Sequence, residues 1–291
     1  VRYVGICGSD LESYRGIRRP EFLSTPARLG HEVSGVIDKV GGQVRGLQVG
    51  QRVACRYVWG AFAESIVCKP FNVHTVPDTL ADEDISPIEV LPGILHAVER
   101  ANITPNTDVL IMGQGVSGLV MTQAAALFSS LNLVVTDLKE KNLELAKRYG
   151  ATHTYQLPAH DASTMDTLRR EFPDGFEAVI PCLLEGNGMM DALDCCAFAG
   201  RIILYGCIAP CNDFDWLKLH RKRVDILTTE PKRDIDMRRW FTEGVNLVDQ
   251  GLINLSEMVT HTFPLSEIQD AFTQRDEGPK DSIHILIDCT K

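Results

Sequence analysis

The 291-residue sequence lacks long apolar runs, an excess of positive charge and any closely spaced set of four cysteines. A membrane-spanning helix needs about 20 consecutive apolar residues, so the first absence indicates that no membrane is a partner. Asp and Glu outnumber Lys and Arg by 39 to 29, and the net charge of −10 argues against nucleic acid as a partner. Nine scattered cysteines, an odd number, are typical of reduced thiols, and we therefore expect a cytoplasmic protein.

Two further absences concern the start and the interior of the chain. The sequence begins at Val1 without Met and without a signal peptide, in the middle of what resembles a folded pattern, so we expect the natural protein to extend further at its N-terminus. No internal repeat, low-complexity tract or flexible linker interrupts the sequence. With 44% hydrophobic residues, a chain of this length has enough apolar side chains for two domains with cores of their own.

Residues 108–137 have the pattern of a βαβ unit, and the rest of the prediction is built around them. An apolar run at 109–112 has the length and composition of a strand buried on both faces. An alanine-rich segment at 119–128 predicts a helix, and a second apolar run at 133–136 predicts the next strand. This order of elements favours a dinucleotide-binding unit.

Glycines in the turn after the first strand have the spacing G-x-G-x-x-G, which in such a unit binds the pyrophosphate of a dinucleotide at the helix N-terminus. We expect contacts to the nucleotide from Gly113, Gly115, Val116, Ser117 and Gly118. Asp137 ends the second strand, where a carboxylate can accept hydrogen bonds from both ribose hydroxyls, and it therefore predicts NAD. The alternative is that the glycines serve only a tight turn between strand and helix.

The sequence on either side of this unit changes in character. Residues 1–76 contain short apolar segments between glycine turns, for example at 33–40, 51–54 and 62–67, and they favour a compact β-rich barrel. From 108 to about 230 the pattern alternates between strands and helices, which is typical of a doubly wound parallel sheet. The predicted fold class is therefore α/β.

A second set of chemically active residues lies upstream of the nucleotide unit. Its members supply the thiol, imidazole and carboxylate that bind zinc: Cys7, His31 and Glu89. Three protein ligands with one open position are the arrangement of a catalytic zinc site. Asp10 and Glu32 stand close to the ligands in the sequence and could orient them, and Ser9 could pass a proton. Alternatively, Cys7 and His31 are ordinary core or surface residues.

Short motifs at fixed intervals run over nearly the whole chain: 5–10 (GICGSD), 29–35 (LGHEVSG), 49–53 (VGQRV), 60–64 (GAFAE), Glu89 with 96–98 (HAV), and the nucleotide stretch. In these motifs the chain resembles the zinc-dependent medium-chain dehydrogenase/reductase family, of the alcohol, sorbitol and threonine dehydrogenase type. The resemblance implies a GroES-like β-barrel catalytic domain at 1–92, a Rossmann NAD-binding domain at 93–251, and a C-terminal segment at 252–291 that returns to the catalytic domain. It also implies a homodimer or homotetramer.

The same resemblance implies roles for individual residues. Cys7, His31 and the residue at position 89 would hold one catalytic zinc, with Glu32 as an alternative ligand, and a Glu at position 89 is similar to the polyol and threonine dehydrogenase branches. The zinc would act as a Lewis acid that lowers the pKa of an alcohol, and hydride would pass between that alcohol and NAD. The implied substrate is a secondary alcohol, such as a polyol, cyclitol, sugar or amino-alcohol, or the corresponding ketone.

The sequence departs from this family at two places. Many relatives carry four closely spaced cysteines that hold a structural zinc, whereas Cys55 and Cys68 cannot form such a site, so we expect no structural zinc. The family often has a His for proton relay where Glu12 stands here, and Glu12 is either a relay group or a surface acid. Two other interpretations stay open: a zinc-free NAD(P)H reductase of the quinone oxidoreductase type, and a non-catalytic nucleotide-binding relative.

Overall fold

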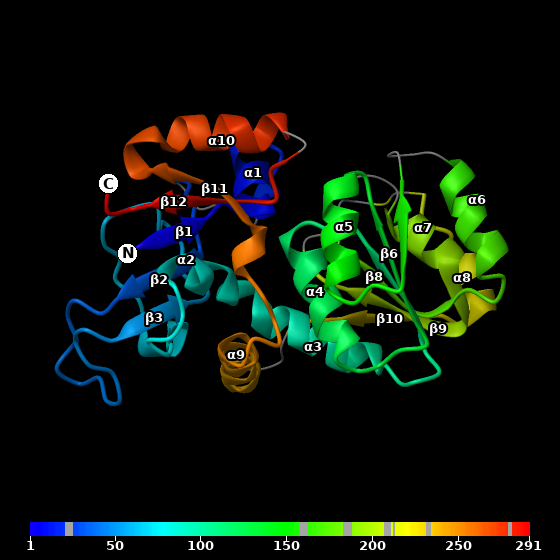
Figure 1. Cartoon of the computed structure of the whole chain (residues 1–291), viewed down its shortest axis with the longest axis horizontal. Helices are drawn as coiled ribbons and strands as arrows, with labels where there is room; N and C mark the ends of the chain where they lie inside the picture. Colours follow the sequence, from blue (N-terminus) through cyan, green and yellow to red (C-terminus); the bar gives the residue numbers. More distant parts are fainter. Residues whose placement is uncertain are drawn as a thin grey trace. The chain divides into compact units, whose positions relative to one another are not determined.

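The computed structural model describes residues 1–20, 26–157, 162–182, 188–206, 211, 213–230, 234–278 and 281–291 (Figure 1). The chain divides into two compact units, one formed by Val1–Pro92 with Arg233–Lys291 and the other by Gly93–Lys232. Among the described helices, none is both long enough and apolar enough to cross a membrane.

The first unit is built on a six-stranded sheet with the order β11-β12-β1-β2-β3-β4. Its strands are β1 (Tyr3–Gly5), β2 (Glu32–Val36), β3 (Arg52–Cys55), β4 (Val73–Thr75), β11 (Val259–Pro264) and β12 (His284–Asp288). The pairing of β11 with β12 is parallel, and the other pairings are antiparallel. Figure 1 shows β1, in blue, beside β12, in red, so the two ends of the chain share one sheet.

Helices and short helical turns cover this sheet and connect its strands. The α-helices are α1 (Gly8–Tyr14), α2 (Asp82–Ile85), α9 (Asp234–Asp249) and α10 (Ile268–Glu277), and α3 (Leu91–Ala101) leads into the second unit. The 3-10 helices are η2 (Pro70–Asn72), η3 (Ser86–Val90), η4 (Ser256–Met258) and η5 (Leu265–Glu267). Side chains of β1, β2, β12 and α10 form the core, including Val4, Val33, Ile285 and Phe272. Each such buried aliphatic or aromatic side chain stabilises the fold by about 1.5–3 kcal/mol.

Helix α9 lies in the first unit, whereas the sequence-based boundary at residue 251 assigns it to the nucleotide-binding domain. Its packing explains the difference, because its Phe241 ring lies 4.8 Å from the His74 ring of β4. Gly244 of α9 packs so closely on Leu91 that an added Cβ would lie 2.8 Å from the Leu91 Cβ. Apolar periodicity predicts that such a helix has a buried face, but it does not say which unit buries it.

The strand predicted at 62–67 is wrong. Gly60 has a φ of 83°, and the Ala63 N–H donates a 2.7 Å hydrogen bond to the Ala61 carbonyl. The chain therefore makes a tight turn here instead of continuing as an extended strand. The Phe62 ring instead packs edge-on against Phe272 of α10, with ring centroids 5.6 Å apart.

The second unit contains a six-stranded sheet with the order β7-β6-β5-β8-β9-β10, and every pairing in it is parallel. Its strands are β5 (Asp108–Met112), β6 (Asn132–Asp137), β7 (His153–Gln156), β8 (Phe176–Pro181), β9 (Cys196–Leu204) and β10 (Asp225–Thr228). Its helices are α4 (Val116–Ala126), α5 (Glu140–Arg148), α6 (Ala162–Glu171), α7 (Gly188–Cys195) and α8 (Trp216–Lys222).

This is the predicted doubly wound sheet. Figure 1 shows α4 and α5 on one side of the strands and α6, α7 and α8 on the other. The central strand β5 is buried from Val109 to Met112, which accounts for its uninterrupted apolar run. The strand order reverses around β5, between β6 and β8, and ligands of such sheets bind beyond the carboxyl ends of the strands at this reversal.

Candidate metal centre and nucleotide loop

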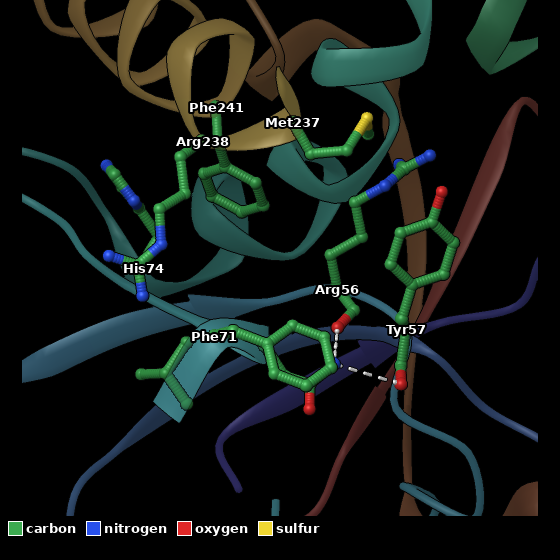
Figure 2. Close-up of a pocket in the computed structure, with 9 residues that line it drawn as sticks. Arg56, Tyr57, Phe71, His74, Met237, Arg238 and Phe241 are labelled. Atoms are coloured by element: carbon green, nitrogen blue, oxygen red, sulfur yellow. Dashed lines mark hydrogen bonds between the residues drawn. The ribbon is translucent and has the colours of Figure 1, made fainter. Parts of the chain in front are cut away.

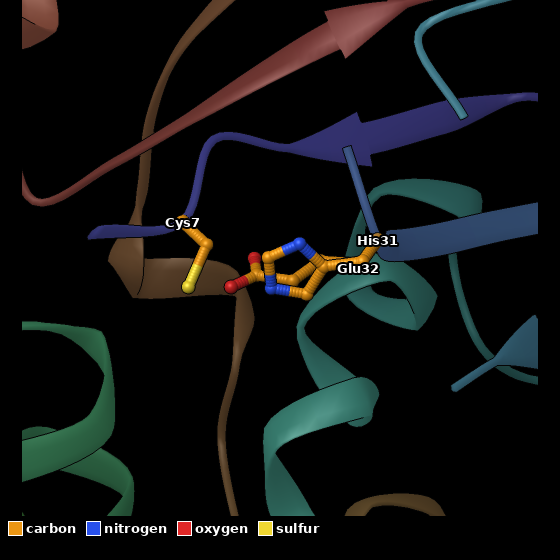
Figure 3. Close-up of side chains that lie close together, drawn as sticks. All are labelled: Cys7, His31 and Glu32. Carbon is orange, nitrogen blue, oxygen red and sulfur yellow. The ribbon is translucent and has the colours of Figure 1, made fainter. Parts of the chain in front are cut away.

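Cys7, His31 and Glu32 lie together in the first unit (Figure 3). Their ligand atoms, one from each side chain, are all within 4.8 Å of one another. Cys7 follows β1, and His31 and Glu32 stand at the start of β2. Because β1 and β2 are antiparallel and Gly5 is paired with Glu32, the end of one strand lies beside the start of the other. The register of two strands thus joins residues that are about 25 positions apart in the sequence.

Asp10 connects the two segments that carry these residues. Its carboxylate is fully buried and accepts hydrogen bonds from the Cys7 N–H at 3.1 Å and from the Gly30 N–H at 2.9 Å. Its Oδ1 atom also lies 3.6 Å from Nδ1 of His31. Asp10 is the third residue of α1, and its side chain accepts the hydrogen bond from Cys7, the N-cap residue just before the helix. This is the geometry of a capping box. The same carboxylate therefore stabilises the start of α1 and faces the His31 ring, and its role in orienting that ring stays a prediction.

The three clustered side chains influence one another's protonation. Burial raises the pKa of the Cys7 thiol, and the nearby Glu32 carboxylate raises it further, while His31 acts in the opposite direction. Burial alone would lower the pKa of His31, but the Cys7 sulfur and the Asp10 carboxylate raise it well above its usual value. Burial alone would raise the pKa of Glu32, but the neighbouring His284 side chain holds it below its usual value. The anionic groups around the His31 ring therefore have a larger effect on its pKa than burial has.

The residues present fit a zinc ion. Zinc binds thiolate, imidazole and carboxylate at about 2.0–2.3 Å, which places ligand atoms of a tetrahedral site roughly 3.3–3.8 Å apart. The observed limit of 4.8 Å is close to that spacing. In the described part of the chain, Nδ1 of His31 and Oε2 of Glu32 are buried without a hydrogen bond, and each faces one charged or polar group: Nδ1 lies 3.6 Å from Oδ1 of Asp10, and Oε2 lies 3.1 Å from Nε2 of His284.

Glu89 is buried on η3 but is not one of the three clustered residues. Its carboxylate forms an ion pair with Arg56, with Nη1 3.0 Å from Oε1, and Arg56 also donates to the Glu89 carbonyl. Burial raises the pKa of Glu89, and Arg56 only partly offsets this. Figure 2 shows Arg56 beside a pocket of the first unit, where Asn72 fixes the backbone by donating to the Arg56 and Tyr57 carbonyls at 2.8 and 3.2 Å. Zinc ligation by Glu89 stays a prediction.

Ser9 and Glu12 both belong to α1, the helix that starts at the metal cluster. The Ser9 carbonyl accepts hydrogen bonds from the Ser13 hydroxyl at 3.1 Å and from Arg18 at 3.3 Å. Arg18 also pairs with Glu12 at 3.2 Å, and both side chains of that pair are largely buried. Arg18 lies over the Trp59 ring, whose centroid is 4.5 Å from that of His31. Glu12 is therefore not a plain surface acid, and its part in a proton relay stays a prediction.

Two residues near the cluster were not singled out by the sequence, and both come from the C-terminal segment. Nε2 of His284, on β12, lies 3.1 Å from Oε2 of Glu32. Arg275, on α10, is partly buried; burial lowers the pKa of its guanidinium, and the charges of Cys7 and Glu32 act in the opposite direction. About 270 residues separate these groups from Cys7, so no local spacing could identify them. The pairing of β1 with β12 is what brings them close.

The glycine loop of the second unit has the geometry that its motif predicts. Gly113 has a φ of 90°, a conformation that favours glycine. A Cβ on Gly118 would lie 1.8 Å from the Gly113 carbonyl oxygen, so only glycine allows α4 to start this close to β5. Gly115 precedes the first residue of α4, and a Cβ there would meet nothing within 4 Å. Val116 and Ser117 follow as the first helical residues, so this helix N-terminus can receive a phosphate.

Asp137 is the last residue of β6, as the sequence predicts. Its carboxylate accepts hydrogen bonds from the Gln114 N–H at 2.6 Å, the Lys139 N–H at 2.8 Å and the Asn142 amide at 3.2 Å. Gln114 belongs to the glycine loop, so the carboxylate and the loop are held together. The Gln114 side chain is itself buried and accepts a hydrogen bond from Thr122 at 2.9 Å. Neither Gln114 nor Asn142 was singled out, since the motif specifies only the glycines and the acid.

Comparisons with known proteins find matches in both units of the chain. The family model for the alcohol dehydrogenase GroES-like domain matches residues 1–78, and the model for zinc-binding dehydrogenases matches residues 117–232. The sorbitol dehydrogenase of Arabidopsis thaliana is 27% identical over 318 residues, which cover 96% of this chain and 84% of that protein. These matches confirm the predicted fold class of a GroES-like domain with a Rossmann domain.

Solved structures show the same fold. A zinc-binding dehydrogenase from Sinorhizobium meliloti 1021, bound to NADP, superposes with a TM-score of 0.84 at 22% identity over 99% of this chain and 90% of its own. A protein from Escherichia coli CFT073, described as a short chain alcohol dehydrogenase in complex with NADH, has a TM-score of 0.83 at 24% identity and the same coverage. The two coenzymes differ, so coenzyme choice in this chain depends on its own residues.

Proposed function

The chain belongs to the zinc-dependent medium-chain dehydrogenase family of oxidoreductases, and we propose that it transfers hydride between a secondary alcohol and NAD. The observation that carries this proposal is the buried cluster of Cys7, His31 and Glu32, whose ligand atoms lie within 4.8 Å of one another. A polyol or sugar alcohol is the substrate class we favour, since sorbitol dehydrogenase is among the similar proteins. The first unit would be the catalytic domain, and the second unit would bind the nucleotide.

Cys7, His31 and Glu32 would hold the zinc, and Glu89 would be the alternative carboxylate ligand. When bound, a zinc ion supplies a Lewis acid that lowers the pKa of a coordinated alcohol. Asp10 would keep the His31 ring in one orientation through its Oδ1 atom, since such partners fix ring orientation in metal sites. Around the cluster, low exposure of His31, Glu32 and Glu89, each 8% or less, would keep water out.

The chain's own residues would also move the proton released from the alcohol. Ser9 follows Cys7 by two positions in α1, so its hydroxyl is the first group we assign to this path. Glu12, one turn further along α1, would receive the proton and release it to solvent. Its carboxylate lies 3.2 Å from Nη1 of Arg18, which fixes where this group stands on the path.

Coenzyme choice would depend on Asp137. Its carboxylate stands at the end of β6 beside the glycine loop, where it can accept hydrogen bonds from the adenosine ribose. The same negative charge would repel the 2′-phosphate of NADP. We therefore propose NAD as the physiological coenzyme.

A panel assay tests this function. The purified protein with zinc is mixed with NAD or NADP and with secondary alcohols, polyols, cyclitols, sugars and amino-alcohols, and coenzyme reduction is followed by absorbance. We expect NAD reduction with at least one polyol or sugar alcohol. Cys7→Ala should abolish this reduction yet bind NAD as the unsubstituted protein does, because the nucleotide loop lies in the other unit.

Two results would contradict the proposal. Reduction of quinones by NAD(P)H that is equally fast in Cys7→Ala would indicate a zinc-free reductase. Nucleotide binding without turnover of any alcohol or ketone, by a protein that holds stoichiometric zinc, would indicate a non-catalytic relative.

A further inference from the structure

Gly5 lies on the central one of three neighbouring strands that meet at the metal cluster. Its strand, β1, pairs with β2 on one side, where Gly5 is opposite Glu32, and with β12 on the other side, where Gly5 is opposite Leu286. Strands in a sheet are about 4.8 Å apart, so β2 and β12 are separated by roughly 10 Å. Side chains on two such strands are normally kept apart by the side chain of the strand between them.

Here the side chains of β2 and β12 meet directly above Gly5. Oε2 of Glu32 and Nε2 of His284 are 3.1 Å apart, and the two side chains are 3% and 1% exposed. A Cβ on Gly5 would lie 2.2 Å from this Glu32 oxygen and 2.5 Å from this His284 nitrogen. The missing side chain of Gly5 therefore provides the space in which the two groups approach.

Backbone conformation does not explain why glycine stands at this position. Gly5 is part of a regular strand, and it is not among the glycines with a positive φ. Gly5 is the last residue of β1, and a glycine in a strand often marks a place where other groups approach closely. The close approach of Glu32 and His284 is such a reason.

In the described residues, Oε2 of Glu32 and Nε2 of His284 face each other at 3.1 Å, and neither atom makes a hydrogen bond of ordinary geometry. A buried carboxylate without a partner is costly, so contact with His284 restricts the positions that Glu32 can take. Glu32 is at the same time one of the three clustered metal-binding residues, so whatever fixes its carboxylate also fixes a ligand.

We propose that His284 is a positioning residue for Glu32 in the zinc site, and that Gly5 is required because it leaves room for their contact. The proposal rests on the proposed function, since it assumes that the Cys7–His31–Glu32 cluster binds zinc. It differs from a purely structural ion pair, which would change the stability of the fold and leave the affinity for zinc unaltered.

The test measures zinc affinity directly. Zinc is removed from the full-length chain, and its dissociation constant is determined by competition with a chromophoric chelator for the unsubstituted protein, H284A, H284Q and G5A. Loss of an outer partner of a metal ligand typically costs 10–100-fold in affinity, and we expect a weakening of about that size for H284A and for G5A. H284Q should keep most of the affinity, because its amide can still donate to Glu32.

A double variant and a spectroscopic measurement separate positioning from general damage. G5A/H284A should bind zinc no more weakly than either single variant, because both changes disrupt one contact. With Co²⁺ in place of zinc, H284A and G5A should show the same altered visible spectrum, and H284Q should resemble the unsubstituted protein. The affinity for NAD serves as the control and should be equal in all variants, since the nucleotide loop lies in the second unit.

Three results would overturn the inference. The first is that H284A and G5A bind zinc as tightly as the unsubstituted protein, which itself binds zinc and turns over substrate. This result would leave the proposed function intact. Another is equal weakening in H284A and H284Q. The third is no stoichiometric zinc in the unsubstituted protein, which would refute the proposed function as well. If H284A does not fold, H284N replaces it, because the shorter amide cannot span the gap above Gly5 and should also weaken zinc binding.

Discussion

We propose that coenzyme choice depends most on a single residue, Asp137. A carboxylate beside the 2′-phosphate of NADP brings like charges together in a partly desolvated site, at a cost of a few kcal/mol. Since about 1.4 kcal/mol is a tenfold effect, we expect kcat/KM to favour NAD by on the order of a hundredfold. Asp137→Ser should narrow or reverse this ratio, mainly through better use of NADP.

The contacts of Asp137 call for a matched control. Its carboxylate also accepts hydrogen bonds from Gln114 and Lys139, so Asp137→Ser removes loop contacts together with the charge. Asp137→Asn removes the charge and keeps an acceptor oxygen. If charge decides, Asn and Ser should both improve kcat/KM with NADP. Equal efficiency with both coenzymes in the unsubstituted protein would show that another residue governs the choice.

Cys68 provides a prediction about thiol reactivity in the first unit. A hydrogen bond from Cys55 lowers the pKa of the Cys68 thiol to about 7, against the weaker opposing effect of its partial burial. Because the thiolate is the reactive form, alkylation by iodoacetamide should rise with pH around a midpoint of about 7. Mass spectrometry of digested protein should find Cys68 modified well before the buried Cys55.

The neighbouring Cys55 supplies the control for that measurement. Cys55→Ala removes the hydrogen bond, so the pKa of Cys68 should rise and its alkylation at pH 7 should slow by roughly tenfold. Cys55→Ser keeps a donor and should change the rate less. Identical pH profiles in all three proteins would mean that Cys55 does not control this thiol.

At the level of single residues, the sequence identifies groups whose neighbours are local and misses those that are distant. Cys7 and His31 occur in short motifs, and their strands β1 and β2 are adjacent in the sheet, so the cluster could be anticipated. His284 is a lone histidine in the sequence, and only the pairing of β12 with β1 brings it to Glu32. Side chains also form ion pairs that the spacing of residues in the sequence does not predict, for example Glu89 with Arg56.

The turn between β5 and α4 yields a prediction that concerns an element as a whole. A methyl group at Gly118 would lie 1.8 Å from the Gly113 carbonyl, so Gly118→Ala must push α4 away from β5. A methyl group at Gly115 meets nothing, and its φ of −70° suits any residue. Gly118→Ala should therefore lower the free energy of unfolding by about 1–3 kcal/mol, the usual cost of overpacking, and Gly115→Ala should not.

Nucleotide affinity should respond differently from stability in this pair. Gly115 allows the backbone to approach the pyrophosphate, so Gly115→Ala should weaken NAD binding while the thermal midpoint stays the same. Gly118→Ala should weaken both. Thermal unfolding and NAD titration of the two variants provide the measurement. A stable Gly118→Ala protein with normal NAD affinity would contradict the assigned role of the loop.

Whole elements were predicted best where the sequence pattern depends on burial alone. The apolar runs of β5 and β6 are buried in a parallel sheet, and both strands were located to within one or two residues. The segment at 62–67 is apolar only at its two ends, with Glu64 and Ser65 between them, and a hydrogen bond from the Ala63 N–H to the Ala61 carbonyl closes a turn there. Helix α9 shows a related limit, since its apolar face indicates burial and leaves the burying partner unspecified.

At the scale of the whole molecule, we predict a homodimer, or a tetramer of dimers, formed through the second unit. In the described part of this unit, β10 forms one edge of the sheet and β7 forms the other. An exposed edge strand invites pairing with another chain. In the preceding α8, Trp216 and Leu217 are 67% and 61% exposed, which is unusual for large apolar side chains unless a partner covers them. Light scattering should give two or four times the mass of one chain, and a uniform monomer would contradict this.

We propose that one zinc ion, held by the Cys7–His31–Glu32 cluster, makes this chain an alcohol dehydrogenase. Zinc is titrated into metal-free protein while NAD reduction is followed with the best alcohol of the panel. We predict no activity without metal and a linear rise that ends at about one zinc per chain, the count for a single catalytic site. Full activity in the metal-free protein, or a rise that is unaffected by Cys7→Ala, would contradict the claim.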